Sequence, residues 1–169
     1  MGGIDLNVRK MVLAAMMAAL MGVCSWLSIP VPPVAFTLQS FAFLLALGVL
    51  GGRWGTVTVL IYLLLGLAGM PVFAGFRFGP AAFLDPTAGF LWGFLAGALV
   101  YWLLEKPGKL PAMIAAQFVC YVCGCLWYSH WAGDIGLPAA ALTCVLPYLL
   151  PDAIKLWLAI KVMGKIRNS

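Results

Sequence analysis

Charged residues are scarce in this chain. Aspartate, glutamate, lysine and arginine together make up 9% of its 169 residues, whereas 64% of the residues are hydrophobic. A water-soluble domain of this length usually has about 25% charged residues. This deficit excludes an ordinary soluble domain and predicts an integral membrane protein that consists of little besides its membrane spans. The length favours a single membrane domain over residues 1–169.

Residues able to carry out chemistry are also few. The chain has one histidine, His130, and no spacing of serine, cysteine, histidine and acidic residues that would activate a nucleophile. It lacks the H-E-x-x-H pattern of zinc enzymes and the G-x-x-x-x-G-K-[ST] loop that binds nucleotide phosphates. We therefore expect a protein that is not an enzyme, has no cofactor and depends on a partner for ATP hydrolysis.

The cysteines favour packing over metal binding. On a helix, the stretch C-Y-V-C-G-C places Cys120 and Cys123 on one face and Cys125 on another, and His130 is expected in a loop. Buried cysteine behaves as a small hydrophobic residue. We therefore expect no metal site and no disulfide among the five cysteines of the chain.

Six apolar stretches are predicted to cross a bilayer, for which a helix needs about 17–25 mainly apolar residues. Their approximate bounds are 10–28, 36–51, 54–70, 87–104, 111–128 and 140–163. The sequence thus predicts an all-α integral membrane protein, a bundle of six transmembrane helices. The first stretch is as long as a true span and lacks a cleavage site, so a secretory signal peptide is not expected.

Basic residues predict the orientation of this bundle. If both termini are cytoplasmic, Arg77 falls outside and Lys155 falls within a span. The cytoplasmic side then holds the remaining eight of the ten lysine and arginine residues: Arg9, Lys10, Arg53, Lys106, Lys109, Lys161, Lys165 and Arg167. This orientation obeys the positive-inside rule. Topology and anionic lipid headgroups of the bilayer then account for the net charge of +5, so no nucleic-acid partner is needed.

The outer loop between the third and fourth predicted spans is unusually apolar. It reads M-P-V-F-A-G-F-R-F-G-P-A-A-F-L-D-P-T-A-G and is rich in aromatic residues and glycine. We expect this long loop to fold back over the helices as a lid. Gly75 and Gly79 would give it backbone conformations that other residues disfavour. Because the outer loops are the elaborate ones, we expect a ligand to enter from the outer face.

Two opposite charges lie in the apolar sixth span. Asp152 and Lys155 are three residues apart and project from nearly the same face of a helix. Pro147 and Pro151 predict a break or kink in this span just before the two charged residues. A charge in the membrane interior costs about 2.5–3.5 kcal/mol on insertion scales. The pair could be a structural salt bridge, but two leucines would be more stable there, so we favour a binding site for a small polar molecule.

Two further polar residues border this predicted site. Gln39, at the end of the first outer loop, could add an amide contact. Arg77, in the lid, could add a cation or could equally be solvated. Together with the charged pair, these residues suit a ligand that has both hydrogen-bonding and acidic groups.

The stretches IPVPPVAFTLQ, GGRWGTVTVLIYLLLGLAGMPVFAGF, DPTAGFLWGF and LPDAIKLW together resemble the BioY family over about residues 10–163. This family comprises biotin-specific substrate-binding membrane subunits of energy-coupling-factor transporters. The resemblance implies a six-helix subunit in the cell (inner) membrane of a prokaryote that captures biotin from outside. It implies as partners a transmembrane coupling subunit and two ATPase subunits, which drive delivery inward.

The resemblance also assigns roles to particular residues. The Asp-x-x-Lys motif of the last helix matches Asp152 and Lys155 and implies that they lie at the biotin site, and the F-T-L-Q stretch matches residues 36–39. In the lid, D-P-T-A-G stands where the family has G-P-T-G-G, so Asp85 and Ala88 replace glycines. Asp85 is expected either to tune ligand entry or to face water.

Biotin suits the polar residues named above. Its ureido ring carries N–H donors that match the carboxylate of Asp152, and its valerate carboxylate matches the cation of Lys155 or Arg77. Its rings and aliphatic tail need apolar walls, for which the candidates are Phe36, Tyr62, Phe73 and Phe76. A binding subunit for another vitamin and a stand-alone small-molecule facilitator stay open as alternatives.

Small residues recur along the first span. Ala14 and Ala18 are four residues apart, as are Ala15 and Ala19, and Gly22 follows one turn later. Such spacing allows another helix to approach closely. The resemblance implies that one of these pairs docks on the coupling subunit. Packing against the other helices of this chain is the alternative.

Overall fold

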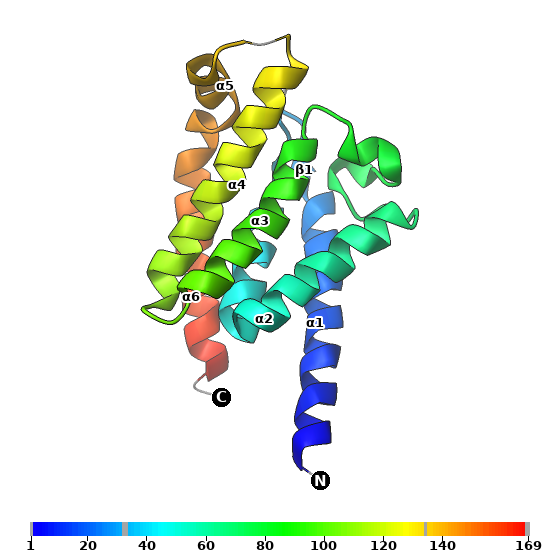
Figure 1. Cartoon of the computed structure of the whole chain (residues 1–169), viewed down its shortest axis with the longest axis vertical. Helices are drawn as coiled ribbons and strands as arrows, with labels where there is room; N and C mark the ends of the chain where they lie inside the picture. The colour runs from blue at the N-terminus through cyan, green and yellow to red at the C-terminus, as the bar shows by residue number, and fades with distance from the viewer. Residues whose placement is uncertain (1, 32–33, 134, 168–169) are drawn as a thin grey trace.

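The computed structural model consists almost entirely of helices (Figure 1). It describes residues 2–31, 34–133 and 135–167, and the side chains of residues 7–31, 34–133 and 135–166. The prediction of a helical protein is confirmed. The α-helices are α1 (Gly2–Trp26), α2 (Gln39–Leu67), α3 (Ala88–Leu104), α4 (Lys109–Trp131), α5 (Leu137–Cys144) and α6 (Leu149–Arg167).

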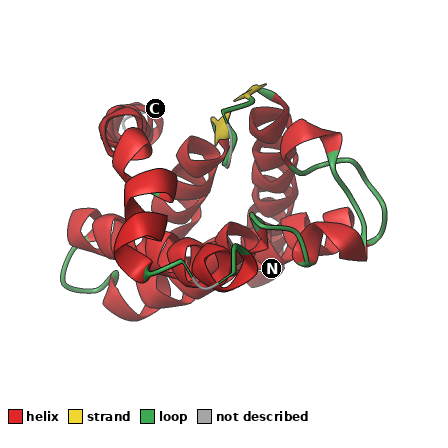
Figure 2. Ribbon diagram, turned by 90° about the horizontal axis from the view of Figure 1, so that it is seen from above, coloured by secondary structure: helices red, strands yellow, loops and turns green. Residues whose placement is uncertain are grey.

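Short elements connect these helices. Strands β1 (Ser28–Ile29) and β2 (Phe36–Thr37) pair antiparallel in the loop between α1 and α2. Seen from above, this strand pair is a small feature beside the helices (Figure 2). The other short elements are 3-10 helices, and they are η1 (Ala74–Phe76), η2 (Pro80–Phe83) and η3 (Leu146–Tyr148).

Helix α2 contains both the second and the third predicted span. Its backbone leaves the helical conformation at Gly51, where φ is 76° and ψ is 174°. A Cβ added to Gly55 would lie 3.1 Å from Cα of Leu47, although positions eight residues apart in a straight helix are separated by about 12 Å. The helix therefore changes direction sharply at Gly51, as Figure 1 shows near the label α2. A non-glycine residue disfavours this positive φ.

Groups from the α3–α4 connection hold this bend. The Gly52 amide donates to Glu105 Oε2 at 2.7 Å, and Lys109 Nζ donates to the Gly48 carbonyl at 3.0 Å. These contacts satisfy backbone groups that the interruption at Gly51 would leave unpaired. The bend of α2 and the α3–α4 connection therefore lie together at one end of the bundle.

The sixth predicted span is broken, as the prolines indicate. Helix α5 ends at Cys144, η3 follows, and α6 starts at Leu149 with Pro151 in its first turn. Proline lacks an amide hydrogen and is tolerated in a first turn, where that hydrogen would have no helical partner. The break positions Asp152 in the first turn of α6.

Helix α4 is longer than predicted. It runs from Lys109 to Trp131, so the expectation that His130 lies in a loop is wrong, and this histidine belongs to the last turn. The residues after position 128 include no helix breaker until Gly133, which has φ of 82°. A glycine with positive φ is a common way to end a helix.

Glycines allow α3 and α4 to pack closely. A Cβ at Gly93 would lie 2.9 Å from Cα of Cys120, and one at Gly97 would lie 2.6 Å from the Ala116 carbonyl oxygen. Small residues four apart permit such an approach between membrane helices. This contact fixes the position of α4, which supplies two residues to the site described below.

The predicted lid corresponds to the α2–α3 connection, residues 68–87, which is called the lid from here on. It is folded back against α2, and both of its predicted glycines adopt positive φ, 69° at Gly75 and 75° at Gly79. The ring of Phe73 lies against Gly66, where an added Cβ would approach the ring to 2.0 Å. Phe73 is 2% exposed, so this aromatic side chain anchors the lid in the core.

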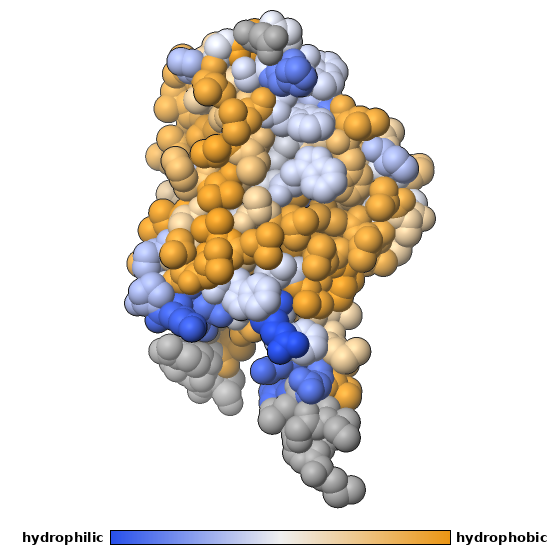
Figure 3. Space-filling model, in the orientation of Figure 1, coloured by the Kyte–Doolittle hydropathy of each residue, from blue (hydrophilic) through white to orange (hydrophobic). Residues whose placement is uncertain are grey.

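The surface and the chain ends agree with a multi-pass membrane protein. Four helical stretches are long and apolar enough to cross a membrane, among the residues that the structure describes: Asn7–Trp26, Gln39–Leu67, Lys109–Trp131 and Leu137–Ile166. Ala88–Leu104 is a shorter apolar helix. Apolar side chains cover much of the visible face, and hydrophilic ones gather at the end that holds both chain termini, with a smaller group at the opposite end (Figure 3).

Candidate functional site

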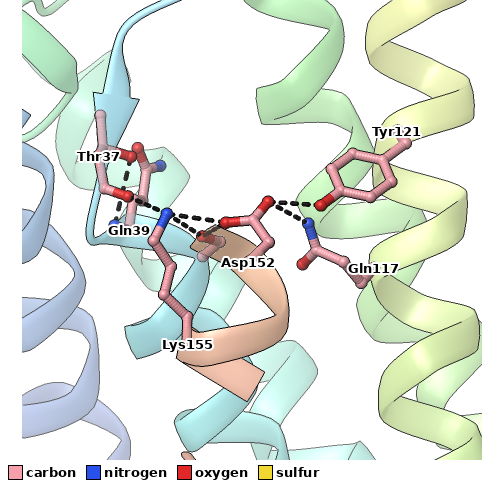
Figure 4. A network of polar contacts seen from close by, with 7 residues as sticks. Thr37, Gln39, Gln117, Tyr121, Asp152 and Lys155 are labelled. Atoms are coloured by element: carbon pink, nitrogen blue, oxygen red, sulfur yellow. Dashed lines mark hydrogen bonds and ion pairs between the residues drawn. The ribbon is translucent and has the colours of Figure 1, made fainter. Parts of the chain in front are cut away.

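The carboxylate of Asp152 accepts hydrogen bonds on both oxygens (Figure 4). Oδ1 receives Lys155 Nζ at 2.8 Å and Ser40 Oγ at 3.0 Å. Oδ2 receives Tyr121 OH at 2.5 Å and Gln117 Nε2 at 3.2 Å. Since an ionised carboxylate has about four acceptor sites, these contacts satisfy it as a buried anion.

The ammonium group of Lys155 is equally well satisfied. Besides its contact with Asp152, Nζ donates to the Thr37 carbonyl at 2.6 Å and lies 3.1 Å from Ser40 Oγ. It also lies 4.1 Å from the centre of the Phe36 ring, in a cation–π contact. Asp152 is 8% and Lys155 is 4% exposed, so both ends of the ion pair are buried.

Four elements meet at this ion pair. Strand β2 supplies the Thr37 carbonyl, the start of α2 supplies Ser40, α4 supplies Gln117 and Tyr121, and the first turns of α6 supply the charges. Because Asp152 lies at the start of α6, the helix dipole also favours its negative charge. The site thus links parts of the chain that are more than a hundred residues apart in sequence.

A cavity adjoins the ion pair. It contains about 770 Å³ of space, including its open mouth. Most of its wall is apolar, with aromatic residues from the lid and from α3. The polar and charged side chains of the wall are Thr37, Gln39, Ser40, Arg77, Thr87, Gln117, Tyr121, Tyr148, Asp152 and Lys155.

Most of the predicted site residues meet at this cavity. Gln39, Arg77 and Phe73 line it, as do both members of the ion pair. Three predicted wall residues are not among those that line it: Phe36, Tyr62 and Phe76. Phe36 stacks on Tyr148 at 6.3 Å between ring centres, beneath Lys155 Nζ.

Tyr62 acts behind the cavity wall. It is fully buried, accepts a hydrogen bond from Gln39 Nε2 at 2.8 Å and donates to the Val72 carbonyl at 2.9 Å. Its ring also packs edge-on against Phe73 at 5.4 Å between ring centres. Tyr62 therefore positions two wall residues, Gln39 and Phe73.

Four polar residues of the cavity wall were not predicted from the sequence, although one signal was present: Ser40, Gln117, Tyr121 and Tyr148. Gln117 and Tyr121 are polar, lie four residues apart in an apolar span and so share a helix face. The Gln117 amide oxygen is buried and accepts no hydrogen bond from the described part of the chain. Tyr148 donates to the Val34 carbonyl and so ties the first outer loop to the break before α6.

Arg77 is held within the lid rather than free in solvent. Nε donates to the Ala74 carbonyl at 2.9 Å, and Nη2 donates to Thr87 Oγ1 at 3.0 Å. Nη1 donates to Asp85 Oδ2 in an ion pair whose side chains are 38% and 21% exposed. Ala88, which follows as the first residue of α3, is fully buried.

The two alanine pairs of α1 differ in burial. Ala14 and Ala18, the buried alanine pair, are 0% and 1% exposed and face the rest of the bundle. Ala15 and Ala19, the exposed alanine pair, lie on the outer surface of α1. Intrachain packing therefore already covers the face of the buried pair. The exposed pair is accessible.

These observations define a multi-pass membrane protein with a cavity beside a buried ion pair. Comparison with known proteins adds the family. Residues 2–169 match the model of the BioY family, and the chain belongs to this family.

Similar proteins cover almost the whole chain. "Biotin transporter BioY" of Thermotoga maritima is 35% identical over 166 residues, which cover 95% of this chain and 97% of the relative. "Probable biotin transporter BioY" of Pyrococcus horikoshii is 31% identical over 164 residues, which cover 97% and 99%. These relatives are transporters and not enzymes, in agreement with the sequence analysis.

A solved structure has the same fold. The crystal structure of the S-component for biotin from an ECF-type ABC transporter matches with a TM-score of 0.87. The match covers 98% of this chain and 94% of that chain at 24% sequence identity. At this identity the likeness concerns the fold.

Proposed function

We propose that this chain is the biotin-binding S component of an energy-coupling-factor transporter. The observation that carries the proposal is the buried Asp152–Lys155 ion pair in the wall of a cavity within a chain of the BioY family. The names of its relatives support biotin as the ligand.

The two polar regions of the cavity suit the two ends of biotin. A ligand carboxylate beside Lys155 would also lie beside Asp152, 2.8 Å away, and would be repelled. The ureido group, with N–H donors and a carbonyl acceptor, is the better partner for adjacent acidic and basic groups. The valerate carboxylate is then left for Arg77, the other cation that borders the cavity.

Binding requires an exchange of hydrogen bonds, because Asp152 already accepts four. The contact from Gln117 is the longest of these, at 3.2 Å, and its donor is neutral. We expect a ureido N–H to replace it. The ion pair and the 2.5 Å contact from Tyr121 would then keep the carboxylate in place.

We further propose six membrane crossings, with the two arms of α2 on either side of Gly51 counted separately. Both termini, the α2 bend and the α3–α4 connection would be cytoplasmic, and the lid would be on the outer face. The positions of Arg53, Lys106 and Lys109 at the bend and connection support this orientation. The membrane would be the cell (inner) membrane of a prokaryote.

The expected partners are a transmembrane coupling subunit and two ATPase subunits, in addition to the lipid bilayer. The exposed alanine pair is the proposed docking surface for the coupling subunit, because small exposed residues on a membrane helix let a second helix approach. Biotin captured on the outside would be released inside when the partners hydrolyse ATP.

Equilibrium binding of a vitamin panel to the purified protein tests the ligand. Biotin should bind more tightly than riboflavin or thiamine, and mass spectrometry should find biotin retained during purification. Preference for another vitamin would contradict biotin specificity. Biotin flux into liposomes that contain this chain alone would instead indicate a stand-alone facilitator.

A further inference from the structure

Arg77 lies on the boundary between two hollows of the molecule. On one side it lines the central cavity described above. On the other it borders an outer hollow between the lid and the end of α4, whose wall includes Phe76, Phe78 and Trp131. Asp85 lines the outer hollow and is not part of the cavity wall. Asp85 therefore holds the guanidinium group from the side away from the cavity.

The charge available to a ligand in the cavity depends on this contact. The charged residues of the cavity wall are Arg77, Lys155 and Asp152. Lys155 is neutralised by Asp152 at 2.8 Å. Arg77 is thus the cation that could receive an anionic ligand group, but Asp85 already neutralises it.

We propose that Asp85 competes with the carboxylate of a bound ligand for Arg77 and so tunes the selectivity of the cavity for anionic ligands. Both competitors are planar carboxylates, and both pair with a guanidinium group in the same way. Arg77 donates to Asp85 from the side away from the cavity, so a ligand carboxylate on the cavity side would share its single positive charge with Asp85 and gain less attraction. The inference rests on the proposed function, in which biotin is the ligand and its carboxylate lies toward the lid.

The side chain of Asp85 can be changed without removing its main-chain anchor. The Asp85 carbonyl accepts a hydrogen bond from Trp127 Nε1 at 2.9 Å, which ties this part of the lid to α4. That bond does not involve the carboxylate. Asp85→Asn therefore removes the competing charge and keeps both the side-chain shape and the anchor.

The experiment compares biotin with its primary amide, which has the same ring and chain but no charge. Dissociation constants are measured for the wild type, Asp85→Asn, Arg77→Gln and the double variant. Asp85→Asn should bind biotin about fivefold more tightly, the upper range for a partly exposed ion pair, and the amide with unchanged affinity. In the Arg77→Gln background the same substitution should have no effect, because the contested cation is gone.

Two controls separate competition from other effects. Asp85→Gly removes the same carboxylate and should give the same preference for biotin. Glu105→Gln removes one negative charge at the α2 bend and should leave both affinities at their wild-type values. Thermal unfolding of each variant in detergent shows which samples are folded.

Several results would overturn the competition. Three of them concern Asp85→Asn: an equal change in affinity for biotin and its amide, weaker biotin binding, or unchanged biotin binding. The fourth is a gain in biotin affinity by Glu105→Gln as large as the gain by Asp85→Asn. A wild type that binds neither ligand would overturn the proposed function, and the competition with it. If the wild type binds biotin and any one of the four results above is found, the competition is overturned but the proposed function is not.

Discussion

Replacement of the buried ion pair by neutral residues separates its structural role from its role in binding. Asp152→Asn leaves Lys155, which is 4% exposed, without its ionic partner. Lys155→Met leaves Asp152, which is 8% exposed, without its partner. Breaking a buried ion pair on one side typically costs about 3–5 kcal/mol of stability. Each single variant should therefore unfold at a clearly lower temperature than the wild type.

The double variant gives the decisive comparison. It has no unpaired charge, and replacement of both partners of a buried pair is often neutral or stabilising. We expect its unfolding temperature to return close to that of the wild type. Its biotin affinity should nevertheless stay about tenfold to a hundredfold weaker, since hydrogen bonds to charged groups contribute about 1.5–3 kcal/mol each.

Two measurements on the same samples provide the test. Thermal unfolding in detergent, followed by tryptophan fluorescence, reports stability, and equilibrium dialysis with labelled biotin reports affinity. A double variant with both wild-type stability and wild-type affinity would show that the pair is a structural salt bridge. The reasoning about the ligand site would then be refuted.

Other variants test the remaining parts of the proposal. Tyr121→Phe removes the 2.5 Å contact to Asp152 and should weaken biotin binding about tenfold. Gln117→Leu removes the contact that the ligand is expected to replace and should change biotin affinity by less than about threefold. Equal losses of affinity for the two variants in equilibrium binding would contradict this exchange. Leucine at the exposed alanine pair should spare biotin binding but stop biotin uptake by cells that have the coupling and ATPase subunits. Leucine at the buried alanine pair should instead lower the unfolding temperature. Wild-type uptake by the variant of the exposed pair would show that the coupling subunit docks elsewhere. Gly51→Ala forces a non-glycine residue into φ of 76° and ψ of 174°, a region that is essentially restricted to glycine, and should cost about 1–3 kcal/mol of stability. Gly164→Ala, in open space, should be neutral or stabilising in the same thermal assay.

Composition and short-range patterns were enough to predict the membrane environment and the ion pair at the centre of the candidate site. The lack of charge predicted a membrane protein, and in that environment the pair Asp152 and Lys155 was the most costly feature of the sequence. The prolines before the pair predicted the break that separates α5 from α6. All of these inferences use residues that are close in sequence, where helix geometry alone relates one position to the next.

Contacts between distant segments were beyond such reasoning. Gln117 and Tyr121 share a helix face, but hydropathy does not tell which helix that face meets, and here it meets the start of α6. The same limit applies to the alanine pairs of α1. The two pairs lie on neighbouring faces of the helix, and only the packing of the other helices decides which face is buried. For Tyr62, the aromatic ring suggested an apolar cavity wall, whereas the fold uses its hydroxyl to hold Gln39 from behind that wall.

The charges at the cavity follow one physical rule. Each cation that borders it, Arg77 or Lys155, is already paired with a carboxylate of the same chain. An unpaired charge as deeply buried as Lys155 would be costly in a membrane protein, so its partner lets the site exist before a ligand arrives. The same partners must be displaced or shared when a polar ligand binds, and the affinity therefore reflects a difference between two well-satisfied networks. For this reason, substitutions that remove a competitor, such as Asp85→Asn, should strengthen binding, whereas substitutions that remove a shared support, such as Tyr121→Phe, should weaken it.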